Sequence, residues 1–227
     1  MPTKRSRVLF IVTSAETVGP RRRVTGYEFS EVAHPYLVFL AHGYHVEFAS
    51  INGGRPPEDG YDAEDRASVL FRASGGFENL NASLSLVDVD LDRYDAIFFP
   101  GGLGPMVDMV DEPVVKQVIA GAFESGKVIG AVCHGPVALL NVTLSDGSAF
   151  LDGKQIAAFT TAEEIGHSEH DVPFMLDDEL VKQGAKHTSA KPFEKHVVVD
   201  GLLVTGQNPA SAAGVAEAIV KLCQISQ

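Results

Sequence analysis

Short apolar runs recur along the chain, and each is followed by a turn or by a helical pattern. Strands covered on both faces of a parallel sheet are apolar at nearly every position, whereas half-exposed strands are apolar at alternate positions. The pattern therefore predicts buried strands at residues 7–13, 45–50, 94–100, 127–132 and 154–159.

Helical patterns separate several of these runs. One helix is predicted over residues 29–43, ending at Gly43, and another over 111–126, with a proline early and a glycine at its end. A last helix should begin at Asn208 as its N-cap, with Pro209 in the first turn. Because strands and helices alternate, we predict an α/β fold: a doubly wound, mostly parallel sheet with helices on both faces, a flavodoxin-like sandwich.

The segment 196–206 contains two short β runs around Asp200-Gly201, a pair typical of a tight turn, so a small β-hairpin is predicted there. Residues 52–66 and 160–175 are rich in loop-forming residues and are predicted to be insertions on the scaffold. No repeat, low-complexity tract or linker divides the sequence. Residues 1–227 are therefore predicted to form a single domain.

Composition limits the partners that the protein can have. The formal net charge of -12 disfavours nucleic acid and anionic membrane surfaces. The apolar run near the N-terminus is too short for a membrane span, so we interpret it as the first strand. The two cysteines are far apart in sequence, which disfavours a disulfide framework and favours a reducing, cytoplasmic compartment.

Cys133 lies where the predicted strand 127–132 ends and a helical pattern begins, in "VIGAVCHGPVALL". Ligands of open α/β sheets bind beyond the carboxyl ends of the strands, so this position predicts an exposed nucleophile at a sharp elbow. The first N–H groups of a following helix would lower the pKa of the thiol. The alternative is a buried structural cysteine, which is how we interpret Cys223 on the stripe of the last helix.

A second strand end opens into glycines in "FFPGGLGPM" at residues 98–106. The spacing lacks the third glycine of a dinucleotide-binding fingerprint. A glycine loop beside a nucleophile can instead offer a backbone N–H to an oxyanion. An ordinary tight turn explains the stretch taken alone equally well.

Two histidine pairs have a spacing that some metal sites use: His42 with His45, and His167 with His170. The first pair straddles a helix end and the second lies in a predicted loop, so neither has a fixed helical face. No metal site is predicted.

Three consecutive arginines, Arg21, Arg22 and Arg23, precede the first predicted helix. Charge runs usually lie in water, so a solvated loop is the favoured interpretation. The alternative is a gate that attracts anionic or carbonyl substrates to an otherwise acidic protein.

Several motifs taken together resemble one family: "TGYEFSEVAHPY", "FFPGGLGPM", "AVCHGP", "AFTTAEE", "VPFMLDDELVKQGA" and "VVVDGLLVTGQNPAS". They span most of the chain and resemble the DJ-1/PfpI superfamily, which is glutamine-amidotransferase-like. Within it, the chain is most similar to the branch of heat-shock chaperones and cofactor-independent glyoxalase III proteins. Each motif alone is unspecific, and their order along the chain carries the resemblance.

The resemblance implies a set of catalytic residues. Cys133 is the nucleophile, His134 follows it, and Glu31 contacts the sulfur. An acidic residue closing "AFTTAEE" orients the histidine; Glu164 aligns best, and Glu163 is a close rival.

The resemblance also implies residues that bind the substrate or its oxyanion: Gly102, Leu103 and Gly135, with backbone N–H donors from Gly102 and His134. Leu103 stands where the related branch often has a histidine, which makes the rim of the expected pocket more apolar.

By the same resemblance, the protein is expected to be a glutathione-independent glyoxalase of the lyase or hydrolase type. It would convert small reactive carbonyls such as methylglyoxal to lactate with no metal or organic cofactor, and it would form a homodimer. A stress-induced holdase chaperone or a thiol oxidation sensor is the main alternative. Amidase, peptidase and deglycase activities rank lower; amide transfer would require a late histidine where the chain has "GQNPAS".

Overall fold

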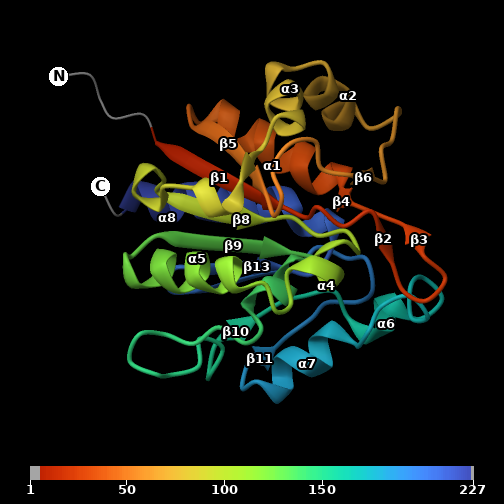
Figure 1. Cartoon of the computed structure of the whole chain (residues 1–227), viewed down its shortest axis with the longest axis vertical. Coiled ribbons are helices and arrows are strands. Elements are labelled where there is room, and N and C mark those ends of the chain that lie inside the picture. Colours follow the sequence, from red (N-terminus) through yellow and green to blue (C-terminus); the bar gives the residue numbers. More distant parts are fainter. Residues whose placement is uncertain (1–5, 226–227) are drawn as a thin grey trace.

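The computed structural model describes residues 6–225, and its centre is a seven-stranded sheet (Figure 1). The strand order is β12-β13-β9-β8-β1-β5-β7. Every neighbouring pair is parallel except β12 with β13. The strands are β1 (Arg7–Val12), β5 (His45–Ser50), β7 (Leu84–Ser85), β8 (Ala96–Phe99), β9 (Val128–Val132), β12 (Val197–Asp200) and β13 (Leu203–Gly206).

Helices cover both faces of this sheet, which confirms the predicted fold class (Figure 1). Alternate residues of β1 point to opposite faces: Leu9 and Ile11 join the core under α5 (Pro113–Glu124), and Phe10 joins the core under α1 (Phe29–Ala41). The second core also takes in α8 (Ala212–Ile225), which packs beside α1. Both sides of each strand are buried, which explains why the strands are apolar throughout.

Shorter elements connect and flank the sheet. They are β2 (Thr17–Val18), β3 (Arg23–Val24), β4 (Tyr27–Glu28), β6 (Glu58–Asp59), α2 (Arg66–Arg72), α3 (Gly75–Asn81), α4 (Pro105–Asp108), β10 (Gln155–Ile156), α6 (Thr161–Glu164), α7 (Leu176–Lys182) and β11 (Lys186–His187). Four 3₁₀ turns complete the described chain: η1 (Leu86–Asp88), η2 (Leu91–Arg93), η3 (Gly135–Leu139) and η4 (Pro209–Ser211). None of the helices in residues 6–225 combines the length and the apolar character that a bilayer span requires.

The predicted strand at 154–159 is wrong in extent and in place. Only Gln155–Ile156 is a strand, and it pairs with β11 outside the central sheet. The residues that follow make isolated hydrogen bonds to the sheet and to the chain just after β9: the Ala157 N–H donates to Thr205 Oγ1, and the Phe159 N–H donates to the Cys133 carbonyl. The apolar run is therefore buried without forming a ladder.

The predicted hairpin at 196–206 is present, and it forms the edge of the central sheet rather than a separate unit. The last helix begins near Asn208 as expected, but through the 3₁₀ turn η4. Asn208 does not cap that turn with its side chain; its Nδ2 donates to Glu163 Oε1 and to the Glu194 carbonyl.

The parallel strands β1, β8, β9 and β13 have their carboxyl ends on the same side of the molecule, where loops are free to form binding sites. The two cavities considered below lie beyond these carboxyl ends.

Candidate active site

Cys133 immediately follows β9, and its backbone has a φ of +60°, in the left-handed region that non-glycine residues rarely adopt. Both of its backbone groups are bonded: the Cys133 N–H donates to the Gly206 carbonyl at 3.0 Å, and the Cys133 carbonyl accepts from the Phe159 N–H at 2.9 Å. The surrounding structure thus maintains a strained elbow, a feature that concentrates at functional sites.

Two glycines let neighbouring chain approach this elbow. A Cβ on Gly101 would lie 2.8 Å from Cys133 Cβ and from the His134 backbone nitrogen. A Cβ on Gly135 would overlap the Phe99 carbonyl. Gly135 therefore serves close packing and does not line the cavity beside the thiol, although the family resemblance implied a place for it in substrate binding.

His134 is buried and bonded on both ring nitrogens. Nδ1 lies 3.3 Å from Cys133 Sγ, and Nε2 lies 2.6 Å from Glu164 Oε1. Burial alone would raise the pKa of Glu164, but hydrogen bonds from His134 and from the Ser168 hydroxyl outweigh it and hold that pKa below its ordinary value. An ionised Glu164 accepts the Nε2 proton, which leaves the Nδ1 lone pair facing the sulfur.

Glu163, the rival of Glu164 in sequence, has a different role. It forms a capping box with Thr160 at the start of α6, and its Oε1 accepts from the Phe193 N–H and from Asn208 Nδ2. Glu163 thus ties α6 to the segment after β11, and Glu164 is the acid beside His134.

Glu31 is fully buried on α1 against the sulfur of Cys133. Its Oε2 accepts from the Gly101 N–H at 2.6 Å. Its Oε1 has no nitrogen or oxygen partner among residues 6–225, so the sulfur is the polar group it can bond. Burial, together with the nearby Glu28 carboxyl, raises the pKa of Glu31 to about 8, so this acid is protonated at neutral pH.

The expectation of a lowered pKa for Cys133 is wrong. Burial raises the pKa of the thiol well above its ordinary value, and Glu31 raises it further; the Gly102 N–H opposes them with a smaller effect. The chain after the thiol is the short 3₁₀ turn η3 rather than an α-helix, so the helix dipole assumed from the sequence is missing. Nδ1 of His134, 3.3 Å from the sulfur, is the base that can take the thiol proton.

A cavity of about 280 Å³ opens beside Cys133. It is lined by Arg23, Glu28, Asp59, Gly60, Gly102, Leu103, Cys133, His134, Phe159, His167, Phe193 and Pro209. Glu28, Asp59, Phe159 and Phe193 were not predicted as site residues from the sequence. Glu28 could have been found from the sequence, because it lies in the same motif as Glu31. Asp59 and Phe193 come from segments with no motif.

The arginine run is only partly the solvated loop that the sequence favoured. Arg21 Nη2 lies 3.0 Å from Asp171 Oδ1, and Arg23 Nη1 donates to the His167 carbonyl at 3.0 Å and lies 3.4 Å from Asp171 Oδ2. Arg22 occupies the turn of the β2–β3 hairpin and is exposed. We call Arg21, Arg23 and Asp171 the latch, because they join this hairpin to the segment that carries Ser168 and Glu164.

The other candidate histidines and the second cysteine lie in ordinary surroundings. His45 pairs with Glu47 at 3.3 Å, and His170 is exposed beside Glu169. Cys223 is buried on α8, as the sequence suggested. Within residues 6–225, no three His, Cys, Asp or Glu side chains gather closely enough to hold a metal ion.

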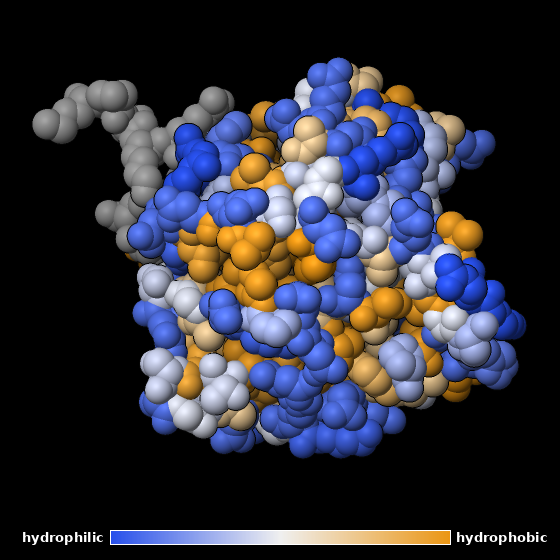
Figure 2. Space-filling view, in the orientation of Figure 1, coloured by the Kyte–Doolittle hydropathy of each residue, from blue (hydrophilic) through white to orange (hydrophobic). Residues whose placement is uncertain are grey.

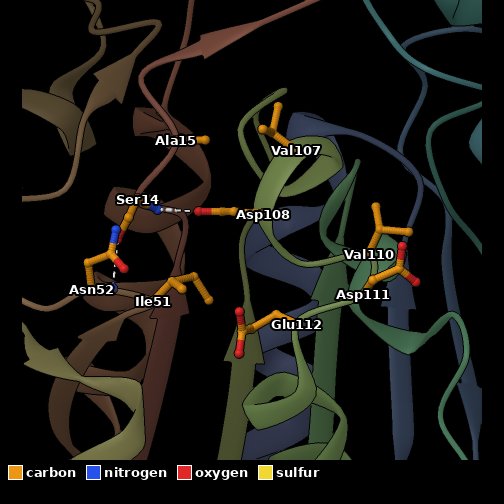
Figure 3. A pocket seen from close by; sticks show the side chains of 9 residues that line it. All are labelled: Ser14, Ala15, Ile51, Asn52, Val107, Asp108, Val110, Asp111 and Glu112. Carbon is orange, nitrogen blue, oxygen red and sulfur yellow. Dashed lines mark hydrogen bonds between the residues drawn. The ribbon is translucent and has the colours of Figure 1, made fainter.

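The larger cavity, of about 500 Å³, lies near the ends of β1, β5 and α4 and the start of α5 (Figure 3). Asp108 faces Ser14 across it and accepts from the Ser14 N–H at 2.7 Å, while Thr13 Oγ1 donates to Asp108 at 2.8 Å. Its lining contains neither cysteine nor histidine. Volume alone favours this cavity, but the reactive groups and the strained backbone favour the one beside Cys133 as the active site.

Comparison with known proteins identifies the family to which the chain belongs. A family model described as the DJ-1/PfpI family matches residues 23–222. Among curated proteins, the chain is 31% identical to the glutathione-independent glyoxalase hsp3102 of Schizosaccharomyces pombe, over 88% of this chain and 90% of that protein. It is 28% identical to glyoxalase 3 of Candida albicans, over 94% of this chain and 97% of that protein.

Solved structures show the same likeness. The rapid encystment protein of 24 kDa from Francisella tularensis superposes with a TM-score of 0.91 at 35% identity, covering 96% of this chain and 99% of that one. Glyoxalase III from Candida albicans superposes with a TM-score of 0.86 at 28% identity, covering 96% of this chain and 97% of that one.

Proposed function

Because the chain belongs to the DJ-1/PfpI family, we propose that it is a glutathione-independent glyoxalase, converting small 2-oxoaldehydes such as methylglyoxal to 2-hydroxy acids such as lactate. The observation that carries this proposal is the hydrogen-bonded series Cys133–His134–Glu164, whose first two members line the cavity, with Glu31 behind the sulfur. Relatives named glyoxalases, aligned over most of the chain, support it.

The first step is addition of the Cys133 sulfur to the aldehyde carbon. Nδ1 of His134 takes the thiol proton as the C–S bond forms, and the ionised Glu164 stabilises the resulting imidazolium. The aldehyde oxygen then takes this proton back from His134 and becomes the hydroxyl of a hemithioacetal, which leaves His134 neutral again. The backbone N–H groups of Gly102 and His134 are the proposed donors to that oxygen while it is charged.

The second step is an internal oxidation and reduction, and the third is hydrolysis. A proton leaves the former aldehyde carbon and another arrives at the neighbouring carbonyl carbon, through an enediol, which gives a lactoyl thioester on Cys133. Water then attacks the thioester, releasing lactate and restoring the thiol. The whole sequence consumes one water per methylglyoxal and needs no external oxidant or reductant.

The size of the cavity suits a small substrate. Its volume of about 280 Å³ is below the range of roughly 300–1,000 Å³ typical of sites for drug-sized ligands. Leu103 and Phe159 supply apolar wall, and Arg23, Glu28, Asp59, His134 and His167 supply polar groups. This lining fits a molecule with a short apolar tail and two adjacent carbonyl groups.

We also infer that the protein is a cytoplasmic homodimer, as the family resemblance suggests. Figure 2 shows apolar areas between hydrophilic side chains on the face that α5 covers, and Val107 on α4 is half exposed. Light scattering on the purified protein at micromolar concentration tests the dimer; a monomeric mass would contradict it.

Lactate formation from methylglyoxal without glutathione tests the function. The unmodified protein should form lactate, and Cys133→Ala should reduce the rate at least about 1,000-fold, because the covalent step is lost. Cys223→Ala is the matched control, since that cysteine lies on α8 away from the cavity, and it should leave the rate unchanged. Full activity of Cys133→Ala would overturn the proposal.

A further inference from the structure

The proposed isomerisation needs a group that moves a proton between two carbons of the bound substrate. His134 receives the thiol proton and is bonded to Glu164 on its other nitrogen. Glu31 is fully buried behind the sulfur and does not line the cavity. A further acid–base group on the cavity wall, separate from the pair that activates the thiol, would be placed to serve this step.

Glu28 lies where such a group is needed. It lines the same cavity as Cys133 and lies three residues before Glu31 in the sequence. Its carboxyl group is close enough to raise the pKa of Glu31 and of Cys133. Its backbone N–H donates to the Gly101 carbonyl at 3.0 Å, which fixes it against the glycine loop beside the thiol.

The carboxyl of Glu28 is also held in place. The Ser30 hydroxyl donates to Oε1 at 3.0 Å. Gly60, with a φ of +70°, packs against both carboxyl oxygens, and a Cβ at that position would overlap them. The chain thus leaves room for a carboxyl group here by placing a glycine opposite it.

We propose that Glu28 is the catalytic acid–base group that transfers the proton between the two carbonyl carbons of the substrate. This inference rests on the proposed glyoxalase function and assigns a role to a residue that lies in the same motif as Glu31 but to which the family resemblance gave none.

The step balances without another reactant. The Glu28 carboxylate removes the C1 proton of the hemithioacetal, and the electron pair of the broken C–H bond forms the C1=C2 double bond of an enediolate. The hydroxyl proton on the C1 oxygen passes to the C2 oxygen, and the protonated Glu28 returns its proton to C2. C1 is thereby oxidised to the thioester level and C2 is reduced to an alcohol.

The charge state of Glu28 supports this role. Burial raises its pKa to about 7; the Ser30 hydroxyl opposes the rise, and Asp59 on β6 adds to it. The other ionisable groups facing the cavity are Arg23 on β3, His134, His167 and the Cys133 thiol, with Glu31 behind. A carboxyl with a pKa near neutrality can both accept and return a proton at working pH.

The test compares Glu28→Gln with Glu78→Gln, the same substitution at an exposed glutamate of α3 that does not line the cavity. Glutamine keeps the acceptor for Ser30 but cannot take a proton, so kcat for lactate formation should fall about 100-fold or more while KM changes little. Glu78→Gln should stay within about threefold of the unmodified protein. In the unmodified protein kcat should rise with pH through a pKa near 7, and this limb should vanish in Glu28→Gln.

The outcomes separate the two proposals. If the unmodified protein forms no lactate, the glyoxalase proposal fails, and with it the role of Glu28. If it forms lactate and Glu28→Gln keeps both its rate and the limb near pH 7, only the role of Glu28 is overturned. Glu28→Asp is a second variant that keeps a carboxyl group, on a side chain shorter by one methylene. It should keep the limb near pH 7 with a reduced kcat. Loss of the limb in this variant would contradict the proposal.

Discussion

The two cavities at the carboxyl edge of the sheet differ in the features that make a site reactive. The larger, about 500 Å³, lies beside β1 and β5, and Asp108 there is satisfied by Thr13 and Ser14. The smaller, about 280 Å³, contains a cysteine with a φ of +60° and lies beside Glu31, a buried acid whose Oε1 has no nitrogen or oxygen partner in the described residues and faces the sulfur.

The difference shows that neither volume nor position in the fold identifies the reactive site. The larger cavity lies beyond the carboxyl ends of β1 and β5, close to where successive connections of the sheet diverge, a common position for ligands in this architecture. Burial raises the pKa of Asp108 there, but no strained backbone accompanies it among the residues that line this cavity. The smaller cavity combines backbone strain at Cys133 with several neighbouring buried groups of raised pKa, and both features cost stability. Substitutions in the smaller cavity should therefore act mainly on catalysis, and substitutions in the larger cavity should act mainly on stability.

Glu164→Gln should have the largest effect on catalysis among the variants considered next. An amide at this position can present its NH₂ group to His134 Nε2, which would reverse the tautomer and put the proton on Nδ1, facing the sulfur. We expect kcat for lactate formation to fall at least about 100-fold.

Glu163→Gln is the control for that variant, because Glu163 is adjacent in sequence but bonds Thr160, Phe193 and Asn208 rather than His134. It should lower the free energy of unfolding by about 1–3 kcal/mol and leave kcat within a few-fold of the unmodified protein. Equal losses of activity in the two variants would remove the distinction between them.

Glu31→Gln should expose the stability cost of the reactive site. The pKa of Glu31 is about 8 in the folded protein against an ordinary value of 4.5, so the folded protein keeps a proton that the unfolded chain loses. The stability from this neutral acid is complete below about pH 4.5 and is lost as the pH rises through 8. Glutamine has no proton to lose.

Denaturant unfolding at pH 5 and pH 8 measures this effect. Relative to the unmodified protein, Glu31→Gln should gain on the order of 2 kcal/mol in free energy of unfolding between the two pH values. Its glyoxalase rate should fall, because the acid beside the sulfur is gone. Parallel stability curves for the two proteins would contradict the raised pKa.

The sequence was sufficient to predict the scaffold and the elbow because both depend on local patterns. Apolar runs ending in glycines specify buried strands and sharp turns, which placed Cys133 at a strand end. The state of its thiol could not be predicted, because that depends on Glu31, which lies about one hundred residues earlier in the chain, and on burial from all sides. Asp59 and Phe193 were missed for the same reason: tertiary packing alone brings them to the cavity.

Asp171→Asn should have a smaller effect, through the latch. Asp171 holds Arg21 and Arg23, and its segment carries Ser168, which donates to Glu164. Weakening these pairs should loosen the support of Glu164, so kcat/KM should fall by about tenfold or less. Arg22→Ala, in the exposed turn of the same hairpin, is the control and should have no effect. Steady-state kinetics measure both, and a loss in the control equal to that in Asp171→Asn would contradict the role of the latch.

Asp108→Ala should have the smallest effect on catalysis and so tests the larger cavity most directly. The substitution removes the acceptor for the Thr13 hydroxyl and for the Ser14 N–H, two donors that Asp108 satisfies at 2.8 and 2.7 Å. Leaving partly buried donors unpaired should lower the free energy of unfolding by about 1–3 kcal/mol. The kcat and KM for methylglyoxal should stay unchanged, since no residue lining this cavity also lines the one beside Cys133. A large fall in kcat with normal stability would mean that the larger cavity takes part in the reaction, and the two regions would then have to be treated as one site.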